Sequence, residues 1–248
     1  VEPRQQTLRA VVDWSHDLLA AEERIVFRRL SVFAGGSSPE AAIGTCSGAA
    51  PDGLVIGADE VDGIVWRLVD KSLVVAAHTA RAPRWTMLET LRDYAAEQLS
   101  ASGERERVLV RHAQHFADFV GPARLGLVGH HQAEWFARVG RERGNLDAAL
   151  ETALARDDAQ LALELTMPLG WYYYMTGEID VGANVLSEAL ACSGPTDPDH
   201  RAGALGLHGW LLANGPSVED AVAATSEGYA MLDRVQDPWV RGIVVSTH

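Results

Sequence analysis

The stretch that decides the fold is TMLETLRDYA, residues 86–95. A short strand pattern over residues 84–88 leads directly into a segment with the spacing of an amphipathic helix. The apolar residues that share one face of this helix are Leu91, Tyr94, Ala95 and Leu99. We therefore predict a strand that turns sharply into a helix at this corner.

The residues before the corner have the element order of a winged helix. Helical spacing of apolar residues predicts helices over residues 8–19, 22–30 and 61–69. Ser38-Pro39-Glu40 combines a capping serine, a proline and an acid, which is typical of the start of another helix. Residues 49–57 are predicted as loop. Two strands, 72–76 and 84–88, are expected around a small loop that contains Arg81 and Pro83.

The rest of the chain is predicted to be helical. Small residues recur from Ala162 onward at positions where paired helices approach closely, which favours a repeat of helical hairpins. These residues include Gly170, Gly182, Ala189, Gly209, Ala221 and Gly228. The predicted fold is thus mainly α, with a winged-helix subdomain and its two-stranded wing over residues 1–100. A tetratricopeptide-like helical array is expected over residues 104–248.

Composition narrows the class of protein. The net charge of −13 and the pI of about 5.1 argue against a polyanion as the main partner, because phosphates are bound chiefly by Lys and Arg. Cys46 and Cys192 lack the spacing of a metal site and suit a reducing compartment, so we expect a cytoplasmic protein. No stretch has the roughly 20 apolar residues of a membrane span. The start Val1-Glu2-Pro3 suggests a piece of a longer protein.

Several motifs resemble the helical half of signal-transduction ATPases of the STAND (NB-ARC) type, in particular actinobacterial regulators of the LuxR/AfsR-like kind. The matching stretches, in chain order, are RQQTLR (4–9), DWSHDLL (13–19), RRLSVFAGG (28–36), LVDKSLV (68–74), LETLRDYA (88–95) and GNLDAAL (144–150). The resemblance implies a P-loop ATPase domain upstream in the same protein, and ATP or ADP as that protein's ligand. This chain has no G-x-x-x-x-G-K-[ST] motif, so we expect no cofactor within it.

The resemblance also assigns a role to the corner. In such ATPases it carries a Met-His-Asp motif that faces the nucleotide, which corresponds here to Met87, Leu88 and Glu89. The family's histidine is replaced by Leu88, which has no hydrogen-bond donor.

A winged helix could instead bind DNA, which is the alternative interpretation. The helix expected to enter the groove, residues 59–71, contains four acids and only two cations, Arg67 and Lys71. Because a reading helix gains affinity from cations on phosphates, this charge pattern argues against direct DNA binding.

Catalytic and metal sites are not favoured. His112 and His115 have the spacing of two ligands on one helix face, but no third ligand is near in sequence. Asp13, Ser15 and His16 are the residue types of a hydrolase triad, yet neighbouring helical residues point apart. We expect no enzyme in this chain.

Four consecutive aromatic residues, 171–174, mark the helical array. Core packing explains some of them, and Tyr172 and Tyr174 are candidates to face a partner protein or a small-molecule inducer. Together with these residues, the resemblance to STAND-type ATPases implies a regulatory segment: the winged helix would relay the nucleotide state, and the array would sense an inducer or partner. The alternative is a DNA-binding winged helix of a transcription factor.

Overall fold

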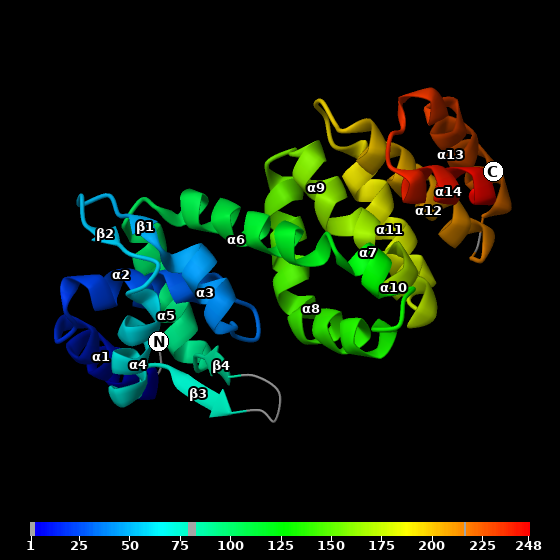
Figure 1. Ribbon diagram of the computed structural model, residues 1–248. Helices are drawn as coiled ribbons and strands as arrows, with labels where there is room; N and C mark the ends of the chain where they lie inside the picture. Colours follow the sequence, from blue (N-terminus) through cyan, green and yellow to red (C-terminus); the bar gives the residue numbers. More distant parts are fainter. Residues whose placement is uncertain (1–2, 79–82, 216) are drawn as a thin grey trace. The chain divides into compact units, whose positions relative to one another are not determined.

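The computed structural model describes residues 3–78, 83–215 and 217–248 (Figure 1). The chain divides into two compact units, residues 1–115 and 116–248. Both consist mainly of helices, and the described strands form two small antiparallel pairs in the first unit. The predicted fold class, mainly α with a small wing, is confirmed. Arg81 of the predicted wing loop lies outside the described residues.

The first unit has the predicted winged-helix order. Its helices are α1 (Pro3–Asp17), α2 (Ala21–Arg29), a 3-10 turn η1 (Leu30–Val32), α3 (Pro39–Cys46), α4 (Val61–Asp70) and α5 (Glu89–Ala101). Helix α3 begins as expected, because the Ser38 side chain accepts a hydrogen bond from the Ala41 amide and Pro39 follows it.

The wing consists of β3 (Val75–His78) and β4 (Pro83–Thr86). These strands are antiparallel, with Val75 opposite Thr86 and His78 opposite Pro83. The predicted strand 84–88 ends two residues early, because Leu88 already serves as the N-cap of α5. Its carbonyl accepts hydrogen bonds from the amides of Leu91 and Arg92.

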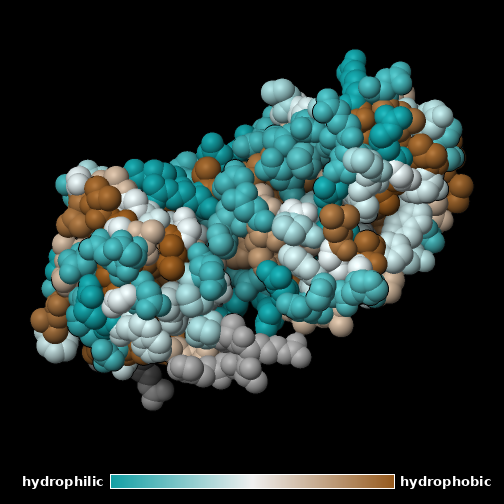
Figure 2. All heavy atoms as spheres, viewed as in Figure 1, coloured by the Kyte–Doolittle hydropathy of each residue, from teal (hydrophilic) through white to brown (hydrophobic). Residues whose placement is uncertain are grey.

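The segment 49–57 is not entirely loop, and here the prediction was wrong. It contains a second hairpin, β1 (Gly48–Ala49) and β2 (Val55–Ile56), with Gly48 opposite Ile56. Each strand has only two residues, too few for an alternating pattern to be recognised in the sequence. Figure 2 shows hydrophobic side chains, in brown, at the edge of the first unit where Figure 1 draws this hairpin.

The core of the first unit lies between α2, α4 and α5. The fully buried side chains there include Val26, Phe27, Val65, Leu68 and Leu99. Helix α1 buries Val12, and Leu19 just after it is also buried, whereas Val11, Trp14 and Leu18 are exposed. The apolar residues of α1 therefore belong to two faces, of which one is covered within this unit.

The second unit is an array of helices. Helix α6 (Arg105–Val120) begins in the first unit and ends in the second. The remaining elements are α7 (Ala123–Gly126), α8 (Gln132–Ala155), α9 (Ala159–Thr166), η2 (Met167–Leu169), α10 (Gly170–Met175), α11 (Ile179–Ala191), α12 (Pro198–Ala213), α13 (Val218–Ala230), η3 (Leu232–Arg234) and α14 (Pro238–Thr247).

Glycines lie where helices of the array approach each other most closely, as predicted. A Cβ added to Gly182 would lie 2.6 Å from Cβ of Tyr173, and one added to Gly209 would lie 2.4 Å from a methyl carbon of Thr225. These contacts join α10 to α11 and α12 to α13. The assignment of the array to the tetratricopeptide class remains a prediction.

Candidate functional site

The strand–helix corner places the three predicted residues in different surroundings. Met87 is half-buried, whereas Leu88 is 62% exposed and Glu89 is also exposed. The corner therefore presents Leu88 to the surface rather than to the core of the first unit. That leaves its side chain free to contact another domain.

A turn at Gly35 and Gly36 is hydrogen-bonded to β4, the strand that leads into the corner. Gly35 and Gly36 have φ angles of +82° and +87°, in the left-handed region that favours glycine. A Cβ on Gly36 would lie 2.4 Å from the Trp85 carbonyl oxygen. Ser37 and Trp85 exchange backbone hydrogen bonds of 2.8 and 2.9 Å, and Arg84 donates to the carbonyls of Gly35 and Gly36. The turn after η1 is thereby attached to β4.

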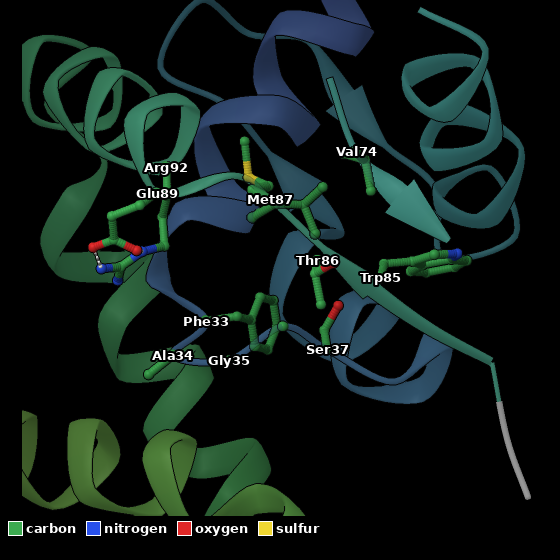
Figure 3. A pocket seen from close by; sticks show the side chains of 12 residues that line it. Phe33, Ala34, Gly35, Ser37, Val74, Trp85, Thr86, Met87, Glu89 and Arg92 are labelled. Atoms are coloured by element: carbon green, nitrogen blue, oxygen red, sulfur yellow. Dashed lines mark hydrogen bonds and ion pairs between the residues drawn. The ribbon is translucent and has the colours of Figure 1, made fainter. Parts of the chain in front are cut away.

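A cavity of about 360 Å³ lies between this turn and the corner (Figure 3). It is lined by Leu30, Phe33, Ala34, Gly35, Gly36, Ser37, Val74, Trp85, Thr86, Met87, Glu89 and Arg92. Ser37 and Trp85 are 1% and 2% exposed, and neither Ser37 Oγ nor Trp85 Nε1 has a hydrogen-bond partner among the described residues. Buried polar atoms are normally paired, so these two groups are exceptions within the first unit.

An ion pair stands at the cavity's rim. Arg92 Nε donates to Glu89 Oε2 at 3.2 Å, and the pair is drawn in Figure 3. The hydrogen bond from Arg92 lowers the pKa of the exposed Glu89 carboxyl, and the same bond raises the pKa of Arg92. Among the described residues, Glu89 pairs with Arg92 and Leu88 has no side-chain donor, so these three side chains offer no unpaired cation to a phosphate.

The chemistry at this cavity is that of a binding surface. Within the described residues, its lining combines apolar side chains, the hydroxyls of Ser37 and Thr86, an indole N–H and one ion pair, without a nucleophile and base in contact. No cluster of three or more possible metal ligands occurs in residues 3–78, 83–215 and 217–248.

The outward face of α4 is the surface that a DNA-binding winged helix would use. Arg67 Nε lies 3.2 Å from Glu23 Oε1, and Lys71 Nζ lies 2.5 Å from Glu23 Oε2. Burial raises the pKa of Glu23, but hydrogen bonds from Lys71, the Ala20 amide and Arg67 outweigh burial. The net pKa is lowered, so the carboxylate form is favoured. Both cations of the 59–71 segment are therefore paired within the unit, while Asp59, Asp62 and Asp70 are exposed.

The aromatic residues of α10 have two different environments. Tyr172 is 7% exposed and stacks on Phe136 of α8, with ring centroids 5.4 Å apart, so it belongs to the core of the array. Tyr174 is half-buried and lies 4.2 Å from Trp210 of α12, measured between ring centroids, and Trp171 stacks on the same Trp210. Of the two predicted partner-facing tyrosines, only Tyr174 is near the surface. Trp210 joins that cluster from a distant part of the sequence.

The remaining candidates do not assemble into sites. Ser15 Oγ donates to the Val11 carbonyl, while His16 packs edge-on against Tyr94. His112 is buried against the ring of Phe33, and His115 lies beside Gly44 of α3. Ser15 thus bonds within its own helix, while the three histidines pack against other elements of the first unit.

The chain is similar to mycobacterial proteins that are named as transcriptional regulators. A protein of Mycobacterium tuberculosis (strain H37Rv) named "Putative HTH-type transcriptional regulator" is 32% identical over 243 residues, and a protein of Mycobacterium bovis with the same description matches equally well. The match covers 95% of this chain but 27% of each relative, so the chain spans about a quarter of their length. An "Uncharacterized protein" of M. tuberculosis is 37% identical over 118 residues, which is 45% of this chain.

Two other comparisons found nothing. No family model matches the chain, and no solved structure matches it significantly. The names of the mycobacterial relatives mention neither an ATPase nor a tetratricopeptide repeat. In addition, no helix among the described residues has the length and apolar character needed to cross a bilayer.

Proposed function

We propose that this chain is a regulatory segment of a longer transcriptional regulator, which transmits a signal through its winged helix and helical array. The similarity across nearly the whole chain to proteins named as HTH-type transcriptional regulators carries this proposal. The binding-type chemistry of the corner cavity fits regulation better than catalysis.

A finer form of the proposal concerns the corner. In a regulator of the STAND type, a P-loop ATPase of the same polypeptide would bind ATP or ADP and the corner would close over it. The exposed Leu88 and the half-buried Met87 support contact by packing, since Leu88 offers no hydrogen bond to a phosphate. The array, with Tyr174 and Trp210 near its surface, would then sense an inducer or a partner protein.

Direct DNA binding by the winged helix is the second candidate. The relatives are named as HTH-type regulators, that is, as proteins with a helix-turn-helix, and these names favour this candidate over an ATPase. Against it stand the paired cations and exposed acids of α4, because DNA affinity depends on cations that are free to contact phosphates.

A variant of the full-length regulator can test the regulatory role. Leu88→Asp changes an exposed N-cap residue to one that caps helices well, so the fold should remain intact. We expect altered transcription of a reporter gene with unchanged affinity for the target DNA. Val128→Asp, at another exposed apolar residue, is the matched control and should leave transcription unchanged. A loss of DNA affinity in Leu88→Asp would instead assign the corner to DNA contact.

A further inference from the structure

A second cavity in the first unit lies against α4, away from the corner. Its volume is about 410 Å³, and it lies where β2, the start of α2 and the first turns of α4 meet. The lining residues are Glu22, Leu54, Val55, Ile56, Asp59, Glu60, Gly63, Ile64 and Arg67. We call this cavity the hairpin groove.

The hairpin groove has an apolar floor and exposed apolar walls. Ile56 and Ile64 are buried beneath it, whereas Leu54 and Val55 are 37% and 62% exposed. A partner that covers these two adjacent aliphatic side chains is bound favourably, because apolar surface is removed from water. The groove can therefore accept aliphatic side chains.

The rim of the groove is acidic. Glu22, Asp59 and Glu60 contribute three carboxylates, and Arg67 contributes the one cation among the described residues of the lining. That cation is already held by Glu22 at 3.6 Å and by Glu23 at 3.2 Å. One oxygen of Glu60 accepts the Gly57 amide at 2.7 Å. The carboxylate of Asp59 and the second oxygen of Glu60 are thus the charges left to an incoming partner.

Gly63 leaves the groove open on the side of α4. Glycine within a helix is unfavourable relative to alanine, yet Gly63 lies in the first turn of α4, on its exposed side. A Cβ added there would meet nothing closer than Arg67 Nη1, at 3.9 Å. Internal packing therefore does not require glycine at this position, whereas close approach of a partner's backbone would.

We propose that the hairpin groove binds a basic peptide segment of a partner protein, with aliphatic side chains on Leu54 and Val55 and Lys or Arg beside Asp59 and Glu60. Charge complementarity selects this occupant: an acidic rim attracts cations and repels both nucleic acid and acidic peptides. The site lies on the face that a winged helix would turn toward DNA, so the same face would here contact protein. The proposal does not depend on the role of the corner.

Selection from a library of random short peptides on the immobilised chain tests the proposal. We expect the enriched peptides to combine Lys or Arg with Leu, Ile, Val or Phe, and to bind more weakly as salt increases. An enriched peptide, labelled for fluorescence anisotropy, then serves as the probe for variants. Failure to enrich any peptide, or enrichment of acidic ones, would overturn the proposal.

Three variants locate the binding site. Gly63→Leu should fill the groove and weaken binding of the probe at least about tenfold. The double variant Asp59→Asn with Glu60→Gln should weaken probe binding about tenfold and make it less dependent on salt. Gly63→Ala should raise the melting temperature while it weakens binding, which separates binding from folding. Asp70→Asn, at an exposed acid of α4 outside the groove, should change nothing.

A DNA duplex provides the opposing outcome. If a labelled duplex binds the chain and Gly63→Leu abolishes that binding, the face contacts DNA and the proposal is wrong. Probe binding that is equal in the original chain and in Gly63→Leu would also contradict it. Either result leaves the regulatory role of the corner to be judged separately by the Leu88→Asp variant.

Discussion

The carboxylate of Glu104 lies 2.7 Å from Nη2 of Arg29, and neither side chain is exposed to solvent. Arg28 also binds Glu104, at 2.6 Å. The Arg29 guanidinium donates further hydrogen bonds to backbone carbonyls at and after the end of α3, among them those of Cys46 and Ala49. Glu104 directly precedes α6, so this buried network ties α2 and the β1–β2 hairpin to the helix that leads into the array.

Glu104→Gln should destabilise the first unit by about 3–5 kcal/mol, because it leaves Arg29 as a buried charge without a carboxylate. Hydrogen–deuterium exchange of the α2 amides measures this loss separately from the array. Glu97→Gln is the matched control: it removes an exposed ion pair with Arg9 in the same unit, for which less than about 1 kcal/mol is expected. Equal effects of the two variants would show that the buried network does not hold the unit together.

Because of the same network, we expect the first unit to lose stability at acidic pH. Burial raises the pKa of Glu104, but hydrogen bonds and charges from Arg29 and Arg28 outweigh it, so the pKa lies below the ordinary 4.5. A carboxyl with a lowered folded-state pKa stabilises the fold above its unfolded pKa, and this contribution is lost as the pH falls through the folded pKa. The free energy of unfolding, measured by urea titration, should therefore decrease as the pH is lowered below about 4.5. In Glu104→Gln this decline should be shallower, and an unchanged acid slope would contradict the assignment.

Much of this architecture follows from local sequence signals. The capped start of α3, the apolar stripe of α4 and the amphipathic α5 were predictable because each signal lies within a few residues. The two-residue strands of the β1–β2 hairpin were not, and neither was the attachment of Ser37 to Trp85, which joins residues far apart in the chain. Likewise, Trp210 joins Tyr174 only through tertiary packing of α10 on α12. The corner residues were found from a family resemblance, whereas the hairpin groove carried no sequence motif.

Close helix packing in the array makes Gly182 a sensitive position. In Gly182→Ala the new Cβ would lie 2.6 Å from Cβ of Tyr173, so α10 and α11 must separate, and we expect a loss of about 1–3 kcal/mol. Gly242→Ala in α14 is the control, since nothing lies within 4 Å of its added Cβ. Because alanine favours helix, that change should stabilise by about 0.5–1 kcal/mol. Thermal melts of the two variants should shift in opposite directions.

Leu88 and Leu91 should respond in opposite ways to the same substitution. Leu88→Asp adds a side-chain cap to α5, which now has none, and should stabilise the chain by about 0.5–1 kcal/mol. Leu91→Asp places a carboxylate in a buried site and should cost several kcal/mol. Chemical unfolding of the two variants distinguishes an exposed corner from a buried one. A large loss of stability in Leu88→Asp would mean that this side chain packs inside the fold.

Binding to DNA is the most direct test of the proposed regulatory role. Labelled duplexes are first selected on the chain from a random pool, and their affinities are then measured by fluorescence anisotropy at physiological salt. We expect no sequence preference. Any binding should be weak, because the cations of α4 are paired and its acids are exposed. It should decrease further with salt, as non-specific phosphate contacts do. Tight binding to a particular duplex sequence, weakened by substitutions on α4, would contradict this account and establish the winged helix as a DNA reader.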